Sequence, residues 1–157
     1  MSNFSHIDEN NNAVMVDVSS KDVSERIAIA SGKIYMTHEC FLMVQNKAHK
    51  KGDVLGVAQV AGIMASKKTS ELIPLTHNIN LESVKVEINP LLQENGYEVI
   101  ATVKCHHVTG VEMEALTSVS ITLLTIYDMC KAIDKKMKID DIHLVKKIGG
   151  KSGEFNY

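Results

Sequence analysis

The chain has 157 residues and a formal net charge of −2, and 45% of its residues are hydrophobic. That apolar content is enough to bury a core, and the length fits one domain spanning 1–157. Aromatic residues make up only 4% of the chain, and tryptophan is missing. Single-stranded nucleic acid is bound largely by aromatic stacking and most DNA by basic domains, so we expect no nucleic-acid partner.

The cysteines and the N-terminal residues bear on the cellular compartment. Cys40, Cys105 and Cys130 form no CxxC motif and are odd in number, which is typical of reduced thiols. Residues 1–12 lack the basic-then-apolar pattern of a signal peptide. The longest uncharged stretch, 115–127, is too short to span a bilayer. We therefore expect a cytoplasmic protein with no membrane partner.

The first half of the chain predicts an arm, a strand and two helices. Residues 1–20 are polar and predict a flexible arm. Branched and small residues alternate at 26–36 and indicate a strand. Thr37 can cap a short helix that runs through Lys47, and a second helix is expected at 54–69 before Pro74 breaks regular structure. The expected apolar stripe of this second helix includes Val57, Val60, Ala61 and Met64.

The second half predicts two strands, a long helix and a last strand. Strands are expected at 83–88 and 97–107, joined by a hairpin-like loop at 89–96. The strongest helix signal lies at 111–133, where a three- and four-residue repeat includes Met113, Leu116, Ser120, Leu123, Tyr127 and Cys130. A strand at 139–145 precedes a glycine-rich, flexible tail at 148–157. The β-α-β-β-α-β order predicts an α+β, ferredoxin-like fold, with an antiparallel sheet and helices on one face.

Short catalytic motifs do not identify a function. Gly150-Lys151-Ser152 resembles the end of a phosphate-binding loop, but the earlier glycine would fall on Val145 and no helix follows. His38-Glu39 begins the zinc-protease pattern, but Leu42 stands where the second histidine is required. Cys105 and His107 would share one face of a strand. Without a further pair of ligands, a packed thiol beside a surface imidazole explains them better than a metal site.

Longer segments are more informative. They are MVDVS (15–19), KGDV (51–54), AGIMASKKTSELIPLTH (61–77), TGVEMEALTSVS (109–120), TIYDMCKA (125–132) and GGKSG (149–153). In order and spacing they resemble the cyclic pyranopterin monophosphate synthases of molybdenum cofactor biosynthesis, from His6 to Gly153. The sequence departs from the family where Thr76 replaces the usual Cys, Asn78 the usual Pro, and Lys68 a frequent Arg.

The resemblance implies a reaction and an assembly. The substrate would be (8S)-3′,8-cyclo-7,8-dihydroguanosine 5′-triphosphate, and the lyase would release cyclic pyranopterin monophosphate and diphosphate. The family forms hexamers, built as a trimer of dimers, and is not known for a catalytic metal. We therefore expect a homohexamer, a small-molecule substrate derived from GTP, and no metal or cofactor.

The resemblance also implies three catalytic residues. Asp128 and Lys131 are spaced i,i+3 on the long helix, so a coupled acid/base pair is one interpretation and a surface ion pair the other. The family carries its catalytic Asp and Lys at these positions. Lys51, beside Gly52, would be a general acid or proton shuttle by resemblance, although a lysine in this setting is more often an ordinary loop lysine.

Substrate recognition is expected at the start of the long helix and in the loop before 83. Glu112 and Glu114 can accept hydrogen bonds from a guanine-like base, although acidic residues also favour this end of a helix through its dipole. His77 can bind phosphate or the base, or have only a structural role. By resemblance, Met113, Leu75 and Thr76 join the substrate contacts.

Basic residues must neutralise the triphosphate. Seven of the 17 basic residues lie between Lys131 and Lys151, which suits a small polyanion or, more commonly, a solvated surface. Our candidates for the phosphates are Lys67, Lys68, Lys147, Lys151 and Arg26. The tail around 149–153 can close over the substrate, or be disordered without a function.

Helix geometry adds a constraint on the assembly. Glu114 and Asp128 are 14 positions apart, or roughly 21 Å along an unbroken helix. If both serve one substrate, they must come from different subunits, which places the site at an interface. Two rival hypotheses are a regulatory module that binds a small molecule without converting it, and a scaffold protein. Neither requires the Asp128–Lys131 pair.

Overall fold

The computed structural model describes residues 4–47 and 52–157. Over these residues the chain forms five strands and four helices, one of them a single turn. In chain order they are β1 (Ser24–Tyr35), α1 (His38–Gln45), α2 (Val54–Ser66), α3 (Thr69–Leu72), β2 (Ser83–Leu91), β3 (Gly96–His107), α4 (Glu112–Cys130), β4 (Lys138–Ile148) and β5 (Phe155–Asn156).

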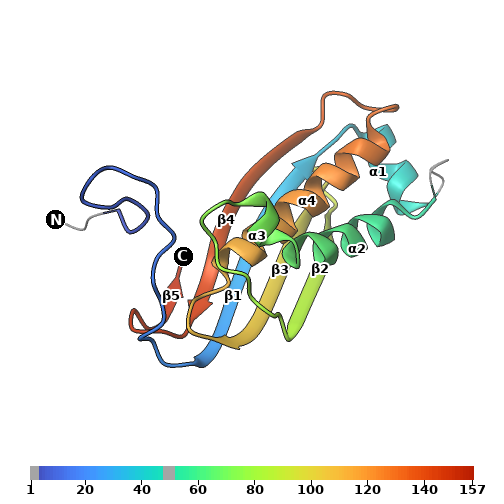
Figure 1. The fold of residues 1–157 in the computed structure, drawn as a ribbon. Helices are drawn as coiled ribbons and strands as arrows, with labels where there is room; N and C mark the ends of the chain where they lie inside the picture. The colour runs from blue at the N-terminus through green and yellow to red at the C-terminus, as the bar shows by residue number, and fades with distance from the viewer. Residues whose placement is uncertain (1–3, 48–51) are drawn as a thin grey trace.

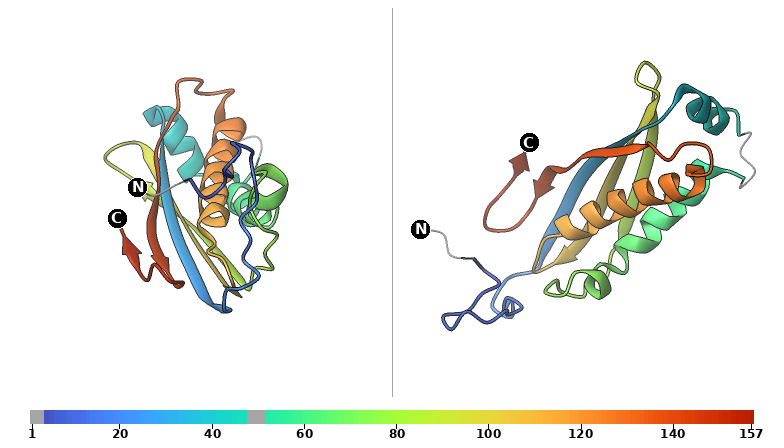
Figure 2. Two further views of the ribbon diagram at one scale, coloured as in Figure 1. Left: turned by 60° about the vertical axis from the view of Figure 1, so that its left-hand side comes forward. Right: turned by 90° about the horizontal axis from the view of Figure 1, so that it is seen from above.

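The described strands form one antiparallel sheet in the order β2-β3-β1-β4-β5. Helices α2 and α4 cover one face of this sheet (Figures 1 and 2). The predicted α+β, ferredoxin-like fold is confirmed, with β5 added at the edge beside β4. The N-terminal arm, α3 and the start of α4 lie at one end of the sheet, and α1 lies at the other (Figure 1).

Strand β1 is the central strand of the sheet, and three of its helix-facing residues, Ala28, Ala30 and Gly32, are small. Ala28 and Ala30 are fully buried, and a side chain at Gly32 would come within 2.9 Å of Val119 and Leu123 on α4. A larger residue there would push α4 off the sheet. The alternation at 26–36 therefore predicted the strand correctly, and its small residues set the distance between sheet and helix.

Close packing also sets how α2 lies against α4. The residues of α2 that are buried are Val54, Ala58, Gly62, Ala65 and Ser66, and a side chain at Gly62 would overlap the Thr122 hydroxyl. The predicted apolar stripe was wrong, because Val57, Val60 and Met64 are between 48% and 56% exposed. The helices approach so closely that small residues occupy the contact, while the larger apolar side chains point outward.

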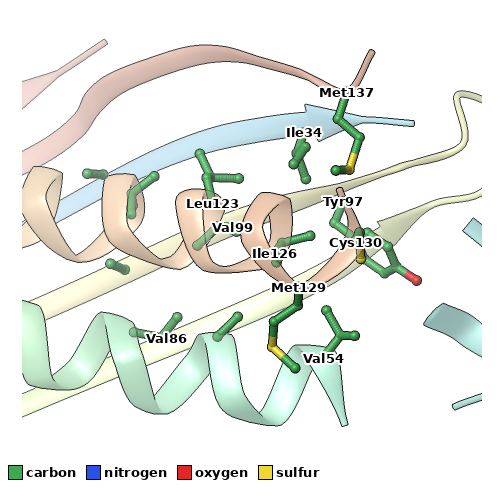
Figure 3. Close-up of a cluster of buried hydrophobic side chains, with 14 of the residues drawn as sticks. Ile34, Val54, Val86, Tyr97, Val99, Leu123, Ile126, Met129, Cys130 and Met137 are labelled. Atoms are coloured by element: carbon green, nitrogen blue, oxygen red, sulfur yellow. The ribbon is translucent and has the colours of Figure 1, made fainter. Parts of the chain in front are cut away.

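The core lies between α4 and the sheet, where Leu123 and Ile126 pack over Val99 (Figure 3). Val54, at the start of α2, lies beside Met129, near the end of α4. The two helices are therefore antiparallel, since Gly62 lies beside Thr122, nearer the start of α4. At the α1 end the core closes with Tyr97, whose ring lies 5.3 Å from that of Phe41.

Several boundaries differ from the sequence prediction. The loop expected at 89–96 is shorter, because β2 continues through Leu91 and includes Pro90. Proline is tolerated there since β2 is an edge strand and needs no outward N–H donor. The long helix ends at Cys130. The helix expected at 54–69 ends at Ser66, and α3 forms a separate turn that begins at Thr69. The last long strand extends over Lys138–Ile148.

The two terminal segments have few regular elements. The described arm contains one isolated bridge, between Ile7 and Ala13. In the tail, β5 pairs with the end of β4, and the Tyr157 N–H donates to the Val145 carbonyl at 2.9 Å. The mobility expected of both segments stays a prediction. Within the described ranges, no helix combines the length and apolar character that crossing a membrane requires.

Candidate active site

Two adjoining cavities lie at the N-terminal end of α4. The first has a volume of about 390 Å³ and is walled by the arm, the loop after α3 and the first turn of α4. The second, of about 530 Å³, is walled by the start of β1, the end of β3 and the tail. Four residues line both cavities: Lys21, Thr109, Gly110 and Glu112. The cavities are therefore two halves of one cleft.

The first cavity gathers three segments that are far apart in sequence. Six residues predicted to contact substrate line it: Leu75, Thr76, His77, Glu112, Met113 and Glu114. The apolar side chains of Val16, Val18 and Ile79 line it as well. An apolar wall with a few carboxylates suits a flat heterocycle that carries N–H donors.

Glu114 is the most enclosed acid of the first cavity, with only 4% of its surface exposed. Burial raises the pKa of this carboxyl to about 7, and repulsion from Glu112 adds to the increase. The N-cap residue of the helix, Val111, provides no side-chain cap. Glu112 and Glu114 lie in its first turn, near the positive end of the helix dipole. Near neutral pH, Glu114 can therefore accept a hydrogen bond or donate one.

His77 is tied to the N-terminal arm. Its Nε2 donates to the Val16 carbonyl at 2.8 Å, which leaves Nδ1 of the neutral ring as an acceptor. The neighbouring Thr76 hydroxyl donates to the Ile73 carbonyl at 2.8 Å and so holds the loop in a turn. These contacts bring the arm against the loop and close one side of the first cavity.

The second cavity is rich in positive charge. Four cationic side chains line it: Lys21, Arg26, Lys147 and Lys151. Arg26 is held in place because its Nε and Nη2 donate to the carbonyls of His107 and Val108, at 3.1 and 3.0 Å. The Ser24 hydroxyl, also on this wall, is shielded from water without a hydrogen-bond partner among the described residues. A ligand oxygen would satisfy it.

The glycines of the tail let the chain pass close to Arg26. Gly150 has a φ of +84°, and any side chain there would overlap Arg26 Nη1. Gly149 has a φ of +103° and lies against the Glu25 carbonyl. Both positions favour glycine for conformational and steric reasons. The GGKSG segment therefore forms one wall of the second cavity.

An ion pair joins the two halves of the cleft. Lys147 Nζ lies 2.8 Å from Glu112 Oε1, and it also donates to the Ser152 hydroxyl at 3.3 Å. Both charged side chains are about three-quarters buried, with 24% and 26% exposed. An ammonium has three donors, so Lys147 keeps one for a ligand. Glu112 therefore holds a cation as well as facing the first cavity.

Asp128 and Lys131 lie at the opposite end of α4. Lys131 Nζ donates to Asp128 Oδ1 at 2.6 Å, and the two side chains are 53% and 63% exposed. Hydrogen bonding and attraction to Asp128 raise the pKa of the Lys131 ammonium. The predicted pair is formed, but neither residue lines either cavity of its own chain.

Three other predicted residues lie apart from the cleft or are not described. Lys67 directly follows α2 as its C-cap, and Lys68 makes an exposed 3.6 Å ion pair with Glu71. Neither lysine lines the two cavities. Lys51 lies outside the described residues. Among the described residues, no group of three or more His, Cys, Asp and Glu side chains is placed to hold a metal ion.

Sequence reasoning missed the contribution of the arm. Lys21, Val16 and Val18 line the cleft, although the sequence predicted only a flexible arm for 1–20. A signal was available in the MVDVS segment, which contains Val16 and Val18 and ends two residues before Lys21. A local pattern could not show that this polar segment packs against residues near 77 and 110.

Comparison with known proteins agrees with the motifs. The family model described as the MoaC family matches residues 15–150. A Clostridium botulinum protein named cyclic pyranopterin monophosphate synthase is 59% identical over 97% of this chain and 96% of its own length. Proteins of the same name from Clostridium perfringens and Campylobacter jejuni are 55% and 56% identical over at least 97% of both chains. The chain therefore belongs to the MoaC family.

Proposed function

We propose that this chain is a cyclic pyranopterin monophosphate synthase of molybdenum cofactor biosynthesis. It would convert (8S)-3′,8-cyclo-7,8-dihydroguanosine 5′-triphosphate to cyclic pyranopterin monophosphate and release diphosphate. Family membership and the names of near-full-length relatives support this reaction. No metal or other cofactor is part of the proposal.

The observation that carries the proposal is the two-part cleft. One half contains the buried Glu114 among apolar side chains, and the other contains four cations. A guanine-derived base fits the first chemistry and a triphosphate fits the second. The shared wall at 109–112 would then lie beside the sugar and the phosphate nearest to it. A ligand with only one of these parts would leave half the cleft unused.

The proton-transfer groups would come from another subunit. Helix α4 has 19 residues, and Glu114 and Asp128 are roughly 21 Å apart along it. The Asp128–Lys131 pair is more than half exposed and so open to a neighbouring molecule. We infer a homohexamer, a trimer of dimers, in which this pair completes the cleft of a neighbouring subunit. Lys51 would join it as a third proton-transfer group, and Lys67 and Lys68 would add charge near the phosphates.

In this arrangement Asp128 and Lys131 would move protons during the ring rearrangement. Each shifts the proton affinity of the other, because a carboxylate at 2.6 Å favours the protonated ammonium. A substrate that displaces one partner would change the pKa of the other at the moment of reaction.

We further propose one domain over 1–157, with a flexible arm at 1–20 and a flexible tail at 148–157, acting in the cytoplasm.

The first experiment is turnover of the cyclised dihydro-GTP by the purified protein. The intact chain should form cyclic pyranopterin monophosphate and diphosphate, while Asp128→Ala and Lys131→Ala should remain folded oligomers without activity. Binding of the compound without conversion by a correctly assembled, intact protein would favour the regulatory module instead.

Mixing inactive variants tests the shared site. Asp128→Ala and Glu114→Ala chains should each be inactive, and co-expression should restore up to about a quarter of wild-type activity. One in four interface sites then receives an intact residue from each subunit, as expected for random pairing. If the mixed oligomers stay inactive, both residues act within one chain and the interface model is wrong.

A further inference from the structure

Lys21 stands apart from the other cations of the cleft because of its position. Among the described residues, it is the one basic side chain that lines both cavities. Arg26, Lys147 and Lys151 line only the second cavity. A ligand that fills both halves must pass Lys21 where it crosses from one to the other.

The backbone around Lys21 is held by local contacts. The Lys21 N–H donates to the Val18 carbonyl at 3.0 Å, and the Ser19 N–H donates to Asp17 Oδ1 at 2.9 Å. The carbonyl of Val16, two residues before Val18, accepts the hydrogen bond from His77. These contacts fold the arm into a turn against the cleft wall. The backbone of Lys21 is therefore held where its side chain lines the same two cavities as Thr109 and Gly110.

The ammonium group of Lys21 also differs from the other cations in its contacts. It forms no ion pair or hydrogen bond with any residue in the described ranges, whereas Lys147 is paired with Glu112 at 2.8 Å. Arg26 likewise uses two of its nitrogens on backbone carbonyls. A free ammonium on an exposed, four-carbon stem can reach a phosphoryl oxygen without first breaking a protein contact.

The reaction identifies the phosphate at which bonds change; this step rests on the proposed function. The product keeps one phosphate as a cyclic ester and loses diphosphate. A sugar hydroxyl oxygen must therefore form a bond to the α-phosphorus while the bond from that phosphorus to the α,β-bridging oxygen breaks. Diphosphate leaves with the electron pair, and the hydroxyl proton passes to a base. Negative charge grows on the bridging oxygen, next to the α-phosphate.

We propose that Lys21 binds the α-phosphoryl group at the junction of the two cavities and stabilises the negative charge that grows as diphosphate leaves. The α-phosphate joins the sugar to the outer phosphates. With the base in the first cavity and the outer phosphates in the second, it falls on the shared wall. A cation there stabilises the transition state more than the bound substrate.

The test compares Lys21→Met with Lys151→Met, since Lys151 lines only the second cavity. Turnover of the cyclised dihydro-GTP gives kcat and KM, and calorimetry gives the affinity for diphosphate alone. We expect Lys21→Met to lower kcat about 100-fold, as loss of one transition-state donor does. Diphosphate affinity should change less than threefold. Lys151→Met should weaken diphosphate binding more than it lowers kcat, and Lys21→Arg should recover part of the kcat.

The outcomes distinguish a failure of the role proposed for Lys21 from a failure of the proposed function. An active wild type whose Lys21→Met variant keeps its kcat would overturn the role of Lys21 alone. An equal loss of diphosphate affinity in both methionine variants would also overturn it, because Lys21 would then be an ordinary outer-phosphate ligand. A wild type that binds the substrate without converting it would instead overturn the proposed function, and the reaction step with it. Unchanged melting temperatures and oligomer size verify that the variants are folded.

Discussion

The two ends of helix α4 differ in how their charged residues are held. At the N-terminal end, Glu114 is 96% buried and faces a cavity built from the arm, the loop after α3 and the first turn of α4. At the C-terminal end, Asp128 and Lys131 form a pair that is more than half exposed. Burial at the N-terminal end raises the pKa of Glu114. Exposure at the C-terminal end leaves the Asp128–Lys131 pair accessible from solvent. The proposed function assigns substrate binding to the first end and proton transfer in a neighbouring subunit to the second.

The largest expected effect is at the exposed end. Asp128→Ala should lower turnover by about 100- to 10,000-fold, the range for loss of a general acid or base. Its free energy of unfolding should change by less than about 1 kcal/mol, since exposed ion pairs contribute little. Steady-state turnover and urea denaturation measure the two quantities. Lys136→Ala removes an exposed charge close by and should keep full activity; an equal loss in both variants would contradict a specific role for Asp128.

At the buried end, Glu114→Gln should change how stability depends on pH. The folded-state pKa of Glu114 is raised from 4.5 to about 7, so the unfolded chain releases this proton first as pH rises. Wild-type stability should therefore fall between about pH 4.5 and 7, by on the order of 3 kcal/mol from this group. Glutamine does not titrate, so the free energy of unfolding of the variant should rise relative to that of wild type over that interval.

Urea denaturation at pH 5 and pH 8 measures this difference. The variant should be close to wild type at the lower pH and more stable at the higher pH. In wild type, the affinity for guanine-type ligands should increase as Glu114 ionises. In the variant, this increase with pH should be absent. A pH-independent difference in stability would mean that Glu114 is ionised in the folded protein throughout this interval.

Gly150→Ala should have a smaller effect, confined to the cation-rich half of the cleft. A methyl group there would displace the Arg26 guanidinium, so diphosphate affinity should fall about tenfold, the loss of one charge-assisted contact. Gly153→Ala is the matched control, because Gly153 also has a positive φ but nothing lies within 4 Å of the added carbon. Calorimetry with diphosphate compares them. Equal losses in both variants would implicate backbone strain rather than Arg26.

The smallest effect is expected in the loop that carries His77. Thr76→Val removes a hydroxyl that donates to the Ile73 carbonyl, and should lower the free energy of unfolding by about 1 kcal/mol. The loss is limited because the Thr76 backbone N–H also donates to that carbonyl. Thr76→Ser keeps the hydroxyl and should match wild type in thermal unfolding. If serine is as destabilising as valine, the threonine methyl group matters and the hydrogen bond does not.

The sequence predicted the elements better than their contacts. Alternation in β1 and the three- and four-residue repeat in α4 located these two elements, because each pattern has the period of a regular element. The repeat did not give the buried face of α4, since only Leu123 and Cys130 of its six residues are buried and Met113 is 36% exposed.

The stripe on α2 was assigned to the wrong side. Hydrophobicity pointed to Val57, Val60 and Met64, while the close approach of α4 required Gly62 and Ala58. Distance between helices is a property of both helices and cannot be read from one.

The candidate site divides in the same way. Motif strings alone identified the family and predicted the Asp128–Lys131 pair, since residues three apart on a helix are neighbours whatever the rest of the chain does. Only the tertiary structure brought the arm, the loop around 77 and the tail together into one cleft. It also paired Lys147 with Glu112 and placed Lys21 between two cavities. Such contacts join residues as far apart in sequence as Arg26 and Gly150, and they depend on how the sheet and helices pack rather than on any local pattern.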